Sequence, residues 1–75
     1  GTANGSSSDV TITSDAVYGL KDFTQYAKVR IELKDDGGVY NVIGYLTPAE
    51  PAKVLSPGVW RFTRVGSAAC GVYSA

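Results

Sequence analysis

The feature that most constrains this chain is an alternation of apolar and charged residues at positions 27–34, which read Ala-Lys-Val-Arg-Ile-Glu-Leu-Lys. Strict alternation is typical of a β-strand with one buried and one exposed face, because successive side chains point to opposite sides of the strand. A second apolar-rich stretch, residues 39–46, follows after only four residues, Asp35-Asp36-Gly37-Gly38. The two stretches therefore predict an antiparallel β-hairpin.

The link between these stretches predicts the pairing of the two strands. Asp36-Gly37 supplies the positive φ angles that a two-residue hairpin turn requires. Pairing outward from this turn places Leu33 opposite Tyr40 and continues to the ends of both strands. One face of the hairpin then collects the residues expected in the core: Ala27, Val29, Ile31, Leu33, Tyr40, Val42 and Leu46.

Short stretches rich in β-branched or aromatic residues predict the remaining strands, at positions 10–13, 17–20, 59–65 and 68–73. Trp60 and Phe62 share one side of the strand 59–65 and are expected in the core. Residues 47–56 contain Pro48 and Pro51, which predict a crossing loop because proline cannot donate a ladder hydrogen bond. The expected fold is all-β, a small antiparallel β-sandwich or partly open β-barrel of five to six short strands.

Length and composition favour association. Residues 1–8 carry no large apolar side chain and predict a flexible polar arm, whereas residues 9–75 predict a single β domain near the lower size limit for independent folding. Small domains often depend on disulfides, metals or oligomerisation. Cys70 is the only cysteine and histidine is absent, so an internal disulfide and a His/Cys zinc site are excluded. We therefore expect stabilisation by copies of the same chain or by a larger body.

The charge pattern argues against two classes of partner. Seven basic residues balance seven acidic ones, whereas nucleic-acid binders show a basic excess. A face with Arg61, Arg64, Lys28 and Arg30 beside Tyr45 and Trp60 is the nucleic-acid alternative, and the neutral net charge counts against it. No apolar run approaches the roughly 18–20 residues that span a bilayer. We expect neither a nucleic-acid partner nor a membrane partner.

The second face of the predicted hairpin mixes charged and apolar residues. The first strand contributes Lys28, Arg30, Glu32 and Lys34, and the second strand contributes Val39, Ile43 and Tyr45. In one interpretation, the basic stems cover Ile43 and Tyr45, with a cation–π contact from Lys28 or Arg30. In the other, a partner protein covers this face. The candidate partner-binding residues are Arg30, Val39, Ile43, Tyr45 and Arg61.

Catalytic and metal-binding patterns are missing from the sequence. Without histidine there is no Ser-His-Asp or Cys-His arrangement. Cys70 lies between Ala69 and Gly71 in a predicted strand, where a small buried residue is expected. Asp35-Asp36-Gly37-Gly38 lacks the spaced oxygen ligands of a calcium loop. We expect no enzymatic activity, no cofactor and no metal site.

These observations favour a non-enzymatic structural module that works by multivalent assembly. With its polar arm at residues 1–8 and its closing segments at residues 57–62 and 69–73, the chain resembles the small decoration or cement proteins of tailed-phage virions. That resemblance implies a virion location, binding to capsid subunits and symmetric homo-oligomers. The alternative is a monomeric carbohydrate- or peptide-binding β-module, in which the five tyrosines and one tryptophan provide stacking surfaces.

Overall fold

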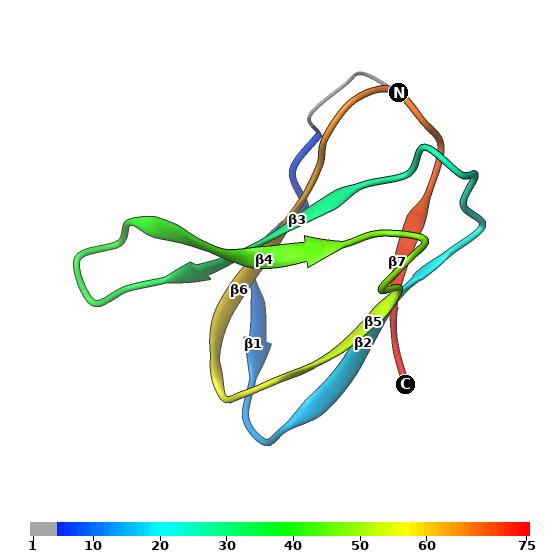
Figure 1. Cartoon of the computed structure of the whole chain (residues 1–75). Coiled ribbons are helices and arrows are strands. Elements are labelled where there is room, and N and C mark those ends of the chain that lie inside the picture. Colours follow the sequence, from blue (N-terminus) through cyan, green and yellow to red (C-terminus); the bar gives the residue numbers. More distant parts are fainter. Residues whose placement is uncertain (1–4) are drawn as a thin grey trace.

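The computed structural model describes residues 5–75, which fold into two antiparallel β-sheets packed face to face (Figure 1). One sheet has four strands in the order β1-β6-β3-β4, with β1 at Val10–Ile12, β6 at Gly58–Arg64, β3 at Val29–Lys34 and β4 at Tyr40–Leu46. The other has three strands in the order β5-β2-β7, with β5 at Ala52–Leu55, β2 at Ala16–Lys21 and β7 at Gly71–Ser74. The predicted all-β fold is confirmed.

The described residues form seven strands, so the expectation of five to six was too low. The additional strand is β5, which lies in the segment 47–56 that was predicted as a loop. Both prolines precede β5, and the four residues of the strand pair on one side only, with β2. The Pro51 carbonyl is also used, because it accepts a hydrogen bond from the Leu20 amide at 2.8 Å. An edge strand that begins after a proline keeps its ladder hydrogen bonds.

The β3–β4 turn differs from the predicted two-residue turn. The amide of Gly38 donates to the carbonyl of Asp35 at 3.0 Å, and the positive φ falls on Gly38, at 84°, and not on Gly37. The Asp35 carboxylate accepts hydrogen bonds from the amides of Gly37, at 2.9 Å, and Val39, at 3.0 Å. The amide of Asp35 donates to the carbonyl of Val39 at 2.8 Å, so the loop has three residues, Asp36-Gly37-Gly38, and ends in a left-handed glycine.

The longer turn shifts the hairpin pairing by one residue. Lys34 pairs with Tyr40 and Glu32 with Val42, instead of the predicted Leu33–Tyr40 pair. A one-residue slip moves side chains to the opposite face of a strand. The expected core positions of Tyr40 and Val42 are therefore wrong, and Val42 is 53% exposed.

A β-bulge then restores the core face of β4. Glu32 pairs with Val42 but Ile31 pairs with Gly44, so Ile43 is an extra residue without a cross-strand partner. Beyond the bulge, Leu46 pairs with Val29 and both side chains are buried. Because the bulge adds a second one-residue shift, Leu46 keeps the core position that the alternation predicts.

The core lies between the two sheets. Ile31 and Leu46 are fully buried, and the stacked rings of Tyr18 and Phe62, 5.3 Å apart, join the three-stranded sheet to the four-stranded one. Trp60 is buried as predicted, and its indole nitrogen donates to the carbonyl of Ser56 at 2.9 Å. Burial of each large apolar side chain stabilises the fold by about 1.5–3 kcal/mol. The buried apolar residues are Ile12, Leu20, Ala27, Val29, Ile31, Leu46, Leu55, Trp60 and Phe62.

The segment before β1 also lies along β6. Ser6 forms a β-bridge with Thr63, and the amide of Ser7 donates to the carbonyl of Phe62 at 2.8 Å. The amide of Arg64 donates to the carbonyl of Gly5 at 2.9 Å. Residues 1–4 of the expected flexible arm lie outside the described residues.

The last strand is shorter than the predicted 68–73. It begins at Gly71, so Cys70 lies just before the strand and is only partly buried, in contrast to the expected buried strand position. In the part of the chain that the structure describes, no helix is long and apolar enough to cross a membrane.

Candidate protein-binding surface

The outer side of the four-stranded sheet carries a connected set of charged and aromatic side chains, which we call the polar face. Cross-strand partners share a side of the sheet, and the pairs Arg30–Tyr45 and Glu32–Arg61 place these four residues together. The polar face consists of Lys28, Arg30, Glu32, Lys34, Tyr40, Tyr45, Arg61 and Thr63.

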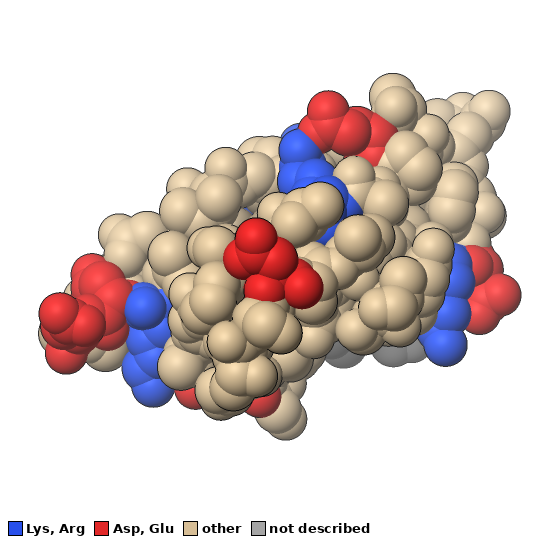
Figure 2. Space-filling view, turned by 90° about the horizontal axis from the view of Figure 1, so that it is seen from below, with Lys and Arg blue, Asp and Glu red and all other residues tan. Residues whose placement is uncertain are grey.

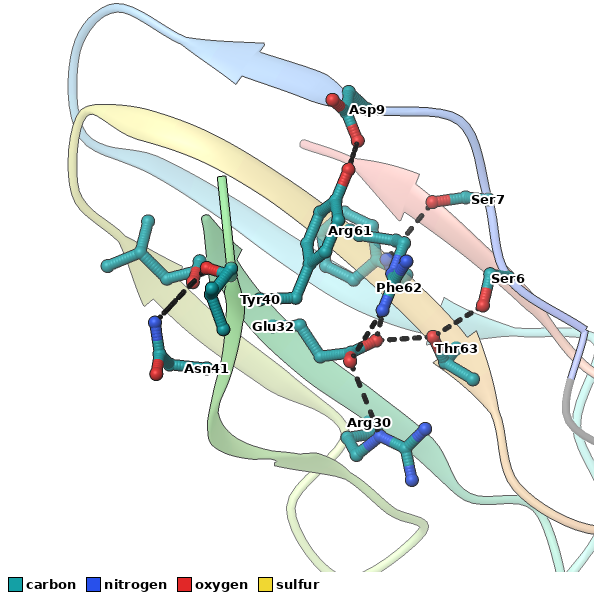
Figure 3. Close-up of polar contacts among 12 residues, drawn as sticks. Ser6, Ser7, Asp9, Arg30, Glu32, Tyr40, Asn41, Arg61, Phe62 and Thr63 are labelled. Carbon is teal, nitrogen blue, oxygen red and sulfur yellow. Dashed lines mark hydrogen bonds and ion pairs between the residues drawn. The ribbon is translucent and has the colours of Figure 1, made fainter. Parts of the chain in front are cut away.

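Glu32 is the centre of the polar face, and only 6% of its side chain is exposed. The Arg61 guanidinium donates to both carboxylate oxygens, from Nη2 to Oε2 at 2.9 Å and from Nε to Oε1 at 3.2 Å (Figure 3). The hydroxyl of Thr63 donates to Oε1, and Arg30 Nε lies 3.7 Å from Oε2. A buried carboxylate needs such partners, because its charge is otherwise costly to remove from water.

A second set of contacts joins the two edges of the sheet. The Tyr40 ring on β4 lies against Arg61, 3.6 Å from the guanidinium carbon. Its hydroxyl donates to Asp9 Oδ1 at 2.5 Å, and Asp9 directly precedes β1 (Figure 3). The Lys34 ammonium lies 3.4 Å from Asp9 Oδ2. The network therefore links β4 to the residue before β1, across β3 and β6.

These contacts fix the charge state of the network. Hydrogen bonds from Arg61 hold the pKa of Glu32 below its usual value, with smaller contributions from Thr63 and the positive charge of Arg30. The hydrogen bond from Tyr40 lowers the pKa of Asp9, and the same bond raises the pKa of the Tyr40 hydroxyl.

An apolar row runs along β4, the edge strand beside the polar face. The row consists of Val39, Val42, Ile43 and Tyr45, which are 59%, 53%, 57% and 37% exposed. The Lys28 ammonium lies 4.5 Å from the centre of the Tyr45 ring, a cation–π contact that belongs to the first interpretation of this face, which named Lys28 or Arg30 as the cation. Val42 and Ile43 keep more than half of their surface exposed, so the β4 row remains open for contact.

The five residues predicted to bind a partner occupy adjoining parts of this region. Arg30, Tyr45 and Arg61 lie on the polar face around Glu32. Ile43 lies at the bulge in the β4 edge, and Val39 lies at the base of the hairpin turn, which projects to the left in Figure 1.

The structure does not bring together the residues of the nucleic-acid alternative. Trp60 is buried in the core, and Arg64 pairs with Val29 and lines a cavity between the sheets. Both residues therefore lie apart from Lys28, Arg30, Tyr45 and Arg61 on the polar face.

Sequence reasoning missed the central partners of the network. Thr63, Tyr40 and Asp9 were not among the candidate residues, and Glu32 was placed on the second face without its partners. The only local signal was that Glu32 and Arg61 both occupy non-core positions of alternating strands. Their contact depends on the pairing of β3 with β6, which are far apart in the sequence.

A second exposed surface covers the outer side of the three-stranded sheet, which we call the apolar face. Val17 pairs with Val54, and Gly19 pairs with Ala52 on one side and Tyr73 on the other. The apolar face consists of these five residues, Val17, Gly19, Ala52, Val54 and Tyr73. Val54 is 66% exposed and Tyr73 42% exposed. Sequence reasoning missed this face, because β5 was predicted as a loop.

Charged side chains are sparse on much of the surface. Seen from below, acidic and basic residues form a few small, separate groups, and other side chains cover most of the surface between them (Figure 2).

A cavity of about 390 Å³ opens between the sheets, beside the N-terminal segment and β7. Its walls are mainly apolar, and Cys70 and Arg64 also contribute. Its lining residues are Gly5, Ser7, Val10, Tyr18, Val29, Phe62, Arg64, Cys70, Gly71 and Val72.

Within residues 5–75, no group of three or more His, Cys, Asp or Glu side chains lies close enough together to hold a metal ion. Comparison with known proteins gives no family model, curated protein or solved structure that matches this chain.

Proposed function

We propose that this chain is a non-enzymatic structural module that binds a larger protein shell and associates with copies of itself, the role of a virion decoration or cement protein. The observation that carries the proposal is the β4 row, where Val42 and Ile43 on the edge strand and Val39 just before it are each more than half exposed. Exposed apolar side chains on a strand edge favour contact with another protein.

The chemistry of the polar face supports a partner with acidic groups. Lys28, Arg30, Lys34 and Arg61 contribute four positive charges, and Glu32 with Asp9 contributes two negative charges. The surface therefore keeps a positive balance in a chain of zero net charge. An acidic patch on the shell would complement it and favour one orientation of docking.

The polar face is less suited to carbohydrate stacking. Sugar binding by an aromatic platform needs a free ring face, and a cation already covers one of the two ring faces of Tyr40 and of Tyr45. Arg61 lies over Tyr40 at 3.6 Å, and Lys28 lies over Tyr45 at 4.5 Å. We therefore rank a protein partner above the carbohydrate-binding alternative.

Co-sedimentation tests the shell-binding proposal. The probe is a shell assembled from the major capsid protein encoded in the same genome. We expect saturable binding of the wild-type chain, at least tenfold weaker for Ile43→Lys, which adds a charge to the β4 row. Thr13→Lys adds the same charge at an exposed site after β1 and should bind like the wild type.

Two results would contradict this function. One is a co-sedimentation result in which the wild-type chain does not bind the shell more strongly than Ile43→Lys does. The other is binding in a glycan panel that Tyr45→Ala abolishes while the circular dichroism spectrum stays unchanged. That result would favour the carbohydrate-binding module.

A further inference from the structure

We infer that the apolar face is the site where a second copy of this chain binds, in a two-fold arrangement with the β2 strands antiparallel. The inference deepens the proposed function and rests on it, because it assigns self-association to one sheet and shell binding to the other. It begins from the exposure of Val54, Tyr73 and Val17, at 66%, 42% and 37%.

The five residues form one continuous patch across all three strands. Val17 and Val54 are direct cross-strand neighbours, as are Gly19 and Tyr73. A Cβ on Gly19 would lie 3.1 Å from the Tyr73 ring, so the ring lies across the glycine. Gly19 itself is buried beneath this ring, so the exposed surface of the patch is made mainly by Val17, Val54 and Tyr73.

Charge favours a second copy on this face and disfavours it on the polar face. In a two-fold contact, the same surface meets itself. The polar face would then bring four cations and two anions against an identical set, with net repulsion. The apolar face carries no charge among its five residues, so it meets itself without that cost.

The ends of β2 add a directional preference. Asp15 directly precedes β2 and Lys21 ends it, and both alternate in phase with Val17 and Gly19. The row along β2 thus reads Asp15, Val17, Gly19, Lys21, with opposite charges at its two ends. When two such rows lie antiparallel, Asp15 of each copy faces Lys21 of the other, and each Val17 faces the Tyr73 ring that covers Gly19.

The size of the face sets the expected affinity. Three strands spaced about 4.8 Å apart, six residues long in β2 and four in β5 and β7, give a face of roughly 14 Å by 13 to 20 Å. Such a contact is smaller than most stable interfaces, so the dimer should be weak in free solution. Several copies held on one shell would raise its occupancy through their effective concentration.

Sedimentation equilibrium over micromolar to millimolar concentrations tests the inference. The wild-type mass should rise from one chain toward two. Val54→Lys, which buries a charge in the contact, should stay at one chain, whereas Val42→Lys, a matched change on the β4 row, should dimerise like the wild type. A wild-type protein that stays monomeric throughout, or a Val54→Lys variant that dimerises normally, would overturn the inference.

A charge exchange tests the antiparallel arrangement. Asp15→Lys and Lys21→Asp should each weaken the dimer at low ionic strength, because each places like charges opposite one another. The double variant should recover most of the lost association. Failure of the double variant to recover, while both single variants are folded, would contradict the antiparallel contact.

The same variants separate this inference from the proposed function. If Val54→Lys loses shell binding while the wild type is monomeric in solution, the shell covers the apolar face and the second-copy inference is wrong. If the wild type dimerises through the apolar face but does not bind the shell, the inference stands and the shell-binding proposal is wrong.

Discussion

The carboxylate of Glu32 and the guanidinium of Arg61 form a two-point ion pair on neighbouring strands, at 2.9 and 3.2 Å. The Glu32 side chain is 6% exposed and the Arg61 side chain 28% exposed. Two parallel charge-assisted hydrogen bonds also fix the orientation of both side chains. The pair therefore stabilises the observed pairing of β3 with β6 from the outer side of the sheet. The apolar core stabilises it only from the inner side.

Glu32→Gln should destabilise the fold. The substitution keeps the shape of the side chain but replaces charge-assisted hydrogen bonds with weaker neutral ones, which should cost about 2 kcal/mol. Urea denaturation followed by Trp60 fluorescence measures the change. Glu50→Gln, which removes the exposed ion pair with Lys53, is the control and should change stability by less than about 0.5 kcal/mol. Equal effects of the two substitutions would contradict the central role of Glu32.

Protonation of the Glu32 carboxylate should make the fold less stable in acid. The pKa of Glu32 lies below its ordinary value of 4.5 in the folded state, because Arg61 and Thr63 stabilise the anion. The contribution of the Glu32 carboxylate to the free energy of unfolding is complete above pH 4.5. It is lost as the pH falls through the lowered pKa of the folded state. The free energy of unfolding should therefore fall below pH 4.5 in the wild type and less steeply in Glu32→Gln. If the free energy of unfolding falls equally steeply with pH in the wild type and in Glu32→Gln, Glu32 is not the source of the acid sensitivity.

Substitution by alanine should affect stability differently at the two adjacent glycines of the hairpin turn. Gly38 has a φ of 84°, where an L-residue is strained, so Gly38→Ala should cost about 1 kcal/mol. Gly37 does not adopt a positive φ, and a Cβ there meets only ordinary contacts. Gly37→Ala should therefore be nearly neutral. Thermal denaturation compares the variants, and the opposite order would favour the two-residue turn at Asp36-Gly37.

Thr63→Val should destabilise the fold by about 1 kcal/mol, because a buried carboxylate loses a hydrogen-bond donor. The Thr63 hydroxyl contacts both Glu32 and the Ser6 hydroxyl, the latter at 2.9 Å, and the residue is 2% exposed. Thr11→Val, at an exposed position on β1, is the control and should change little. Amide hydrogen exchange should also show faster exchange at Ser7 in Thr63→Val. Unchanged stability would mean that the hydroxyl is dispensable.

Local pattern predicts much of this fold. The alternation at residues 27–34 predicts β3 and places Val29 and Ile31 in the core, because the side-chain period of a strand is two. The hairpin register could not be predicted in the same way. It depends on the Asp35 cap and on the bulge at Ile43, and neither alters the apolar pattern. The strand β5 was not predicted from the sequence, because the prolines just before it suggest a loop.

The candidate surface was predicted only in part. Alternation is sufficient to place Arg30, Tyr45 and Arg61 on a non-core side. The contact of Glu32 with Arg61 joins residues 29 positions apart, and the bond of Tyr40 to Asp9 joins residues 31 apart. Contacts of this range follow from strand order, which the sequence pattern does not specify.

The central claim is that this chain assembles through the outer sides of its sheets. The most direct test is the solution mass of the wild type and of Val54→Lys, measured side by side by sedimentation equilibrium from micromolar to millimolar concentration. We predict that the wild type rises from its monomer mass of 7.9 kDa toward twice that value while Val54→Lys remains a monomer. A wild-type mass that stays at 7.9 kDa at every concentration would contradict the account.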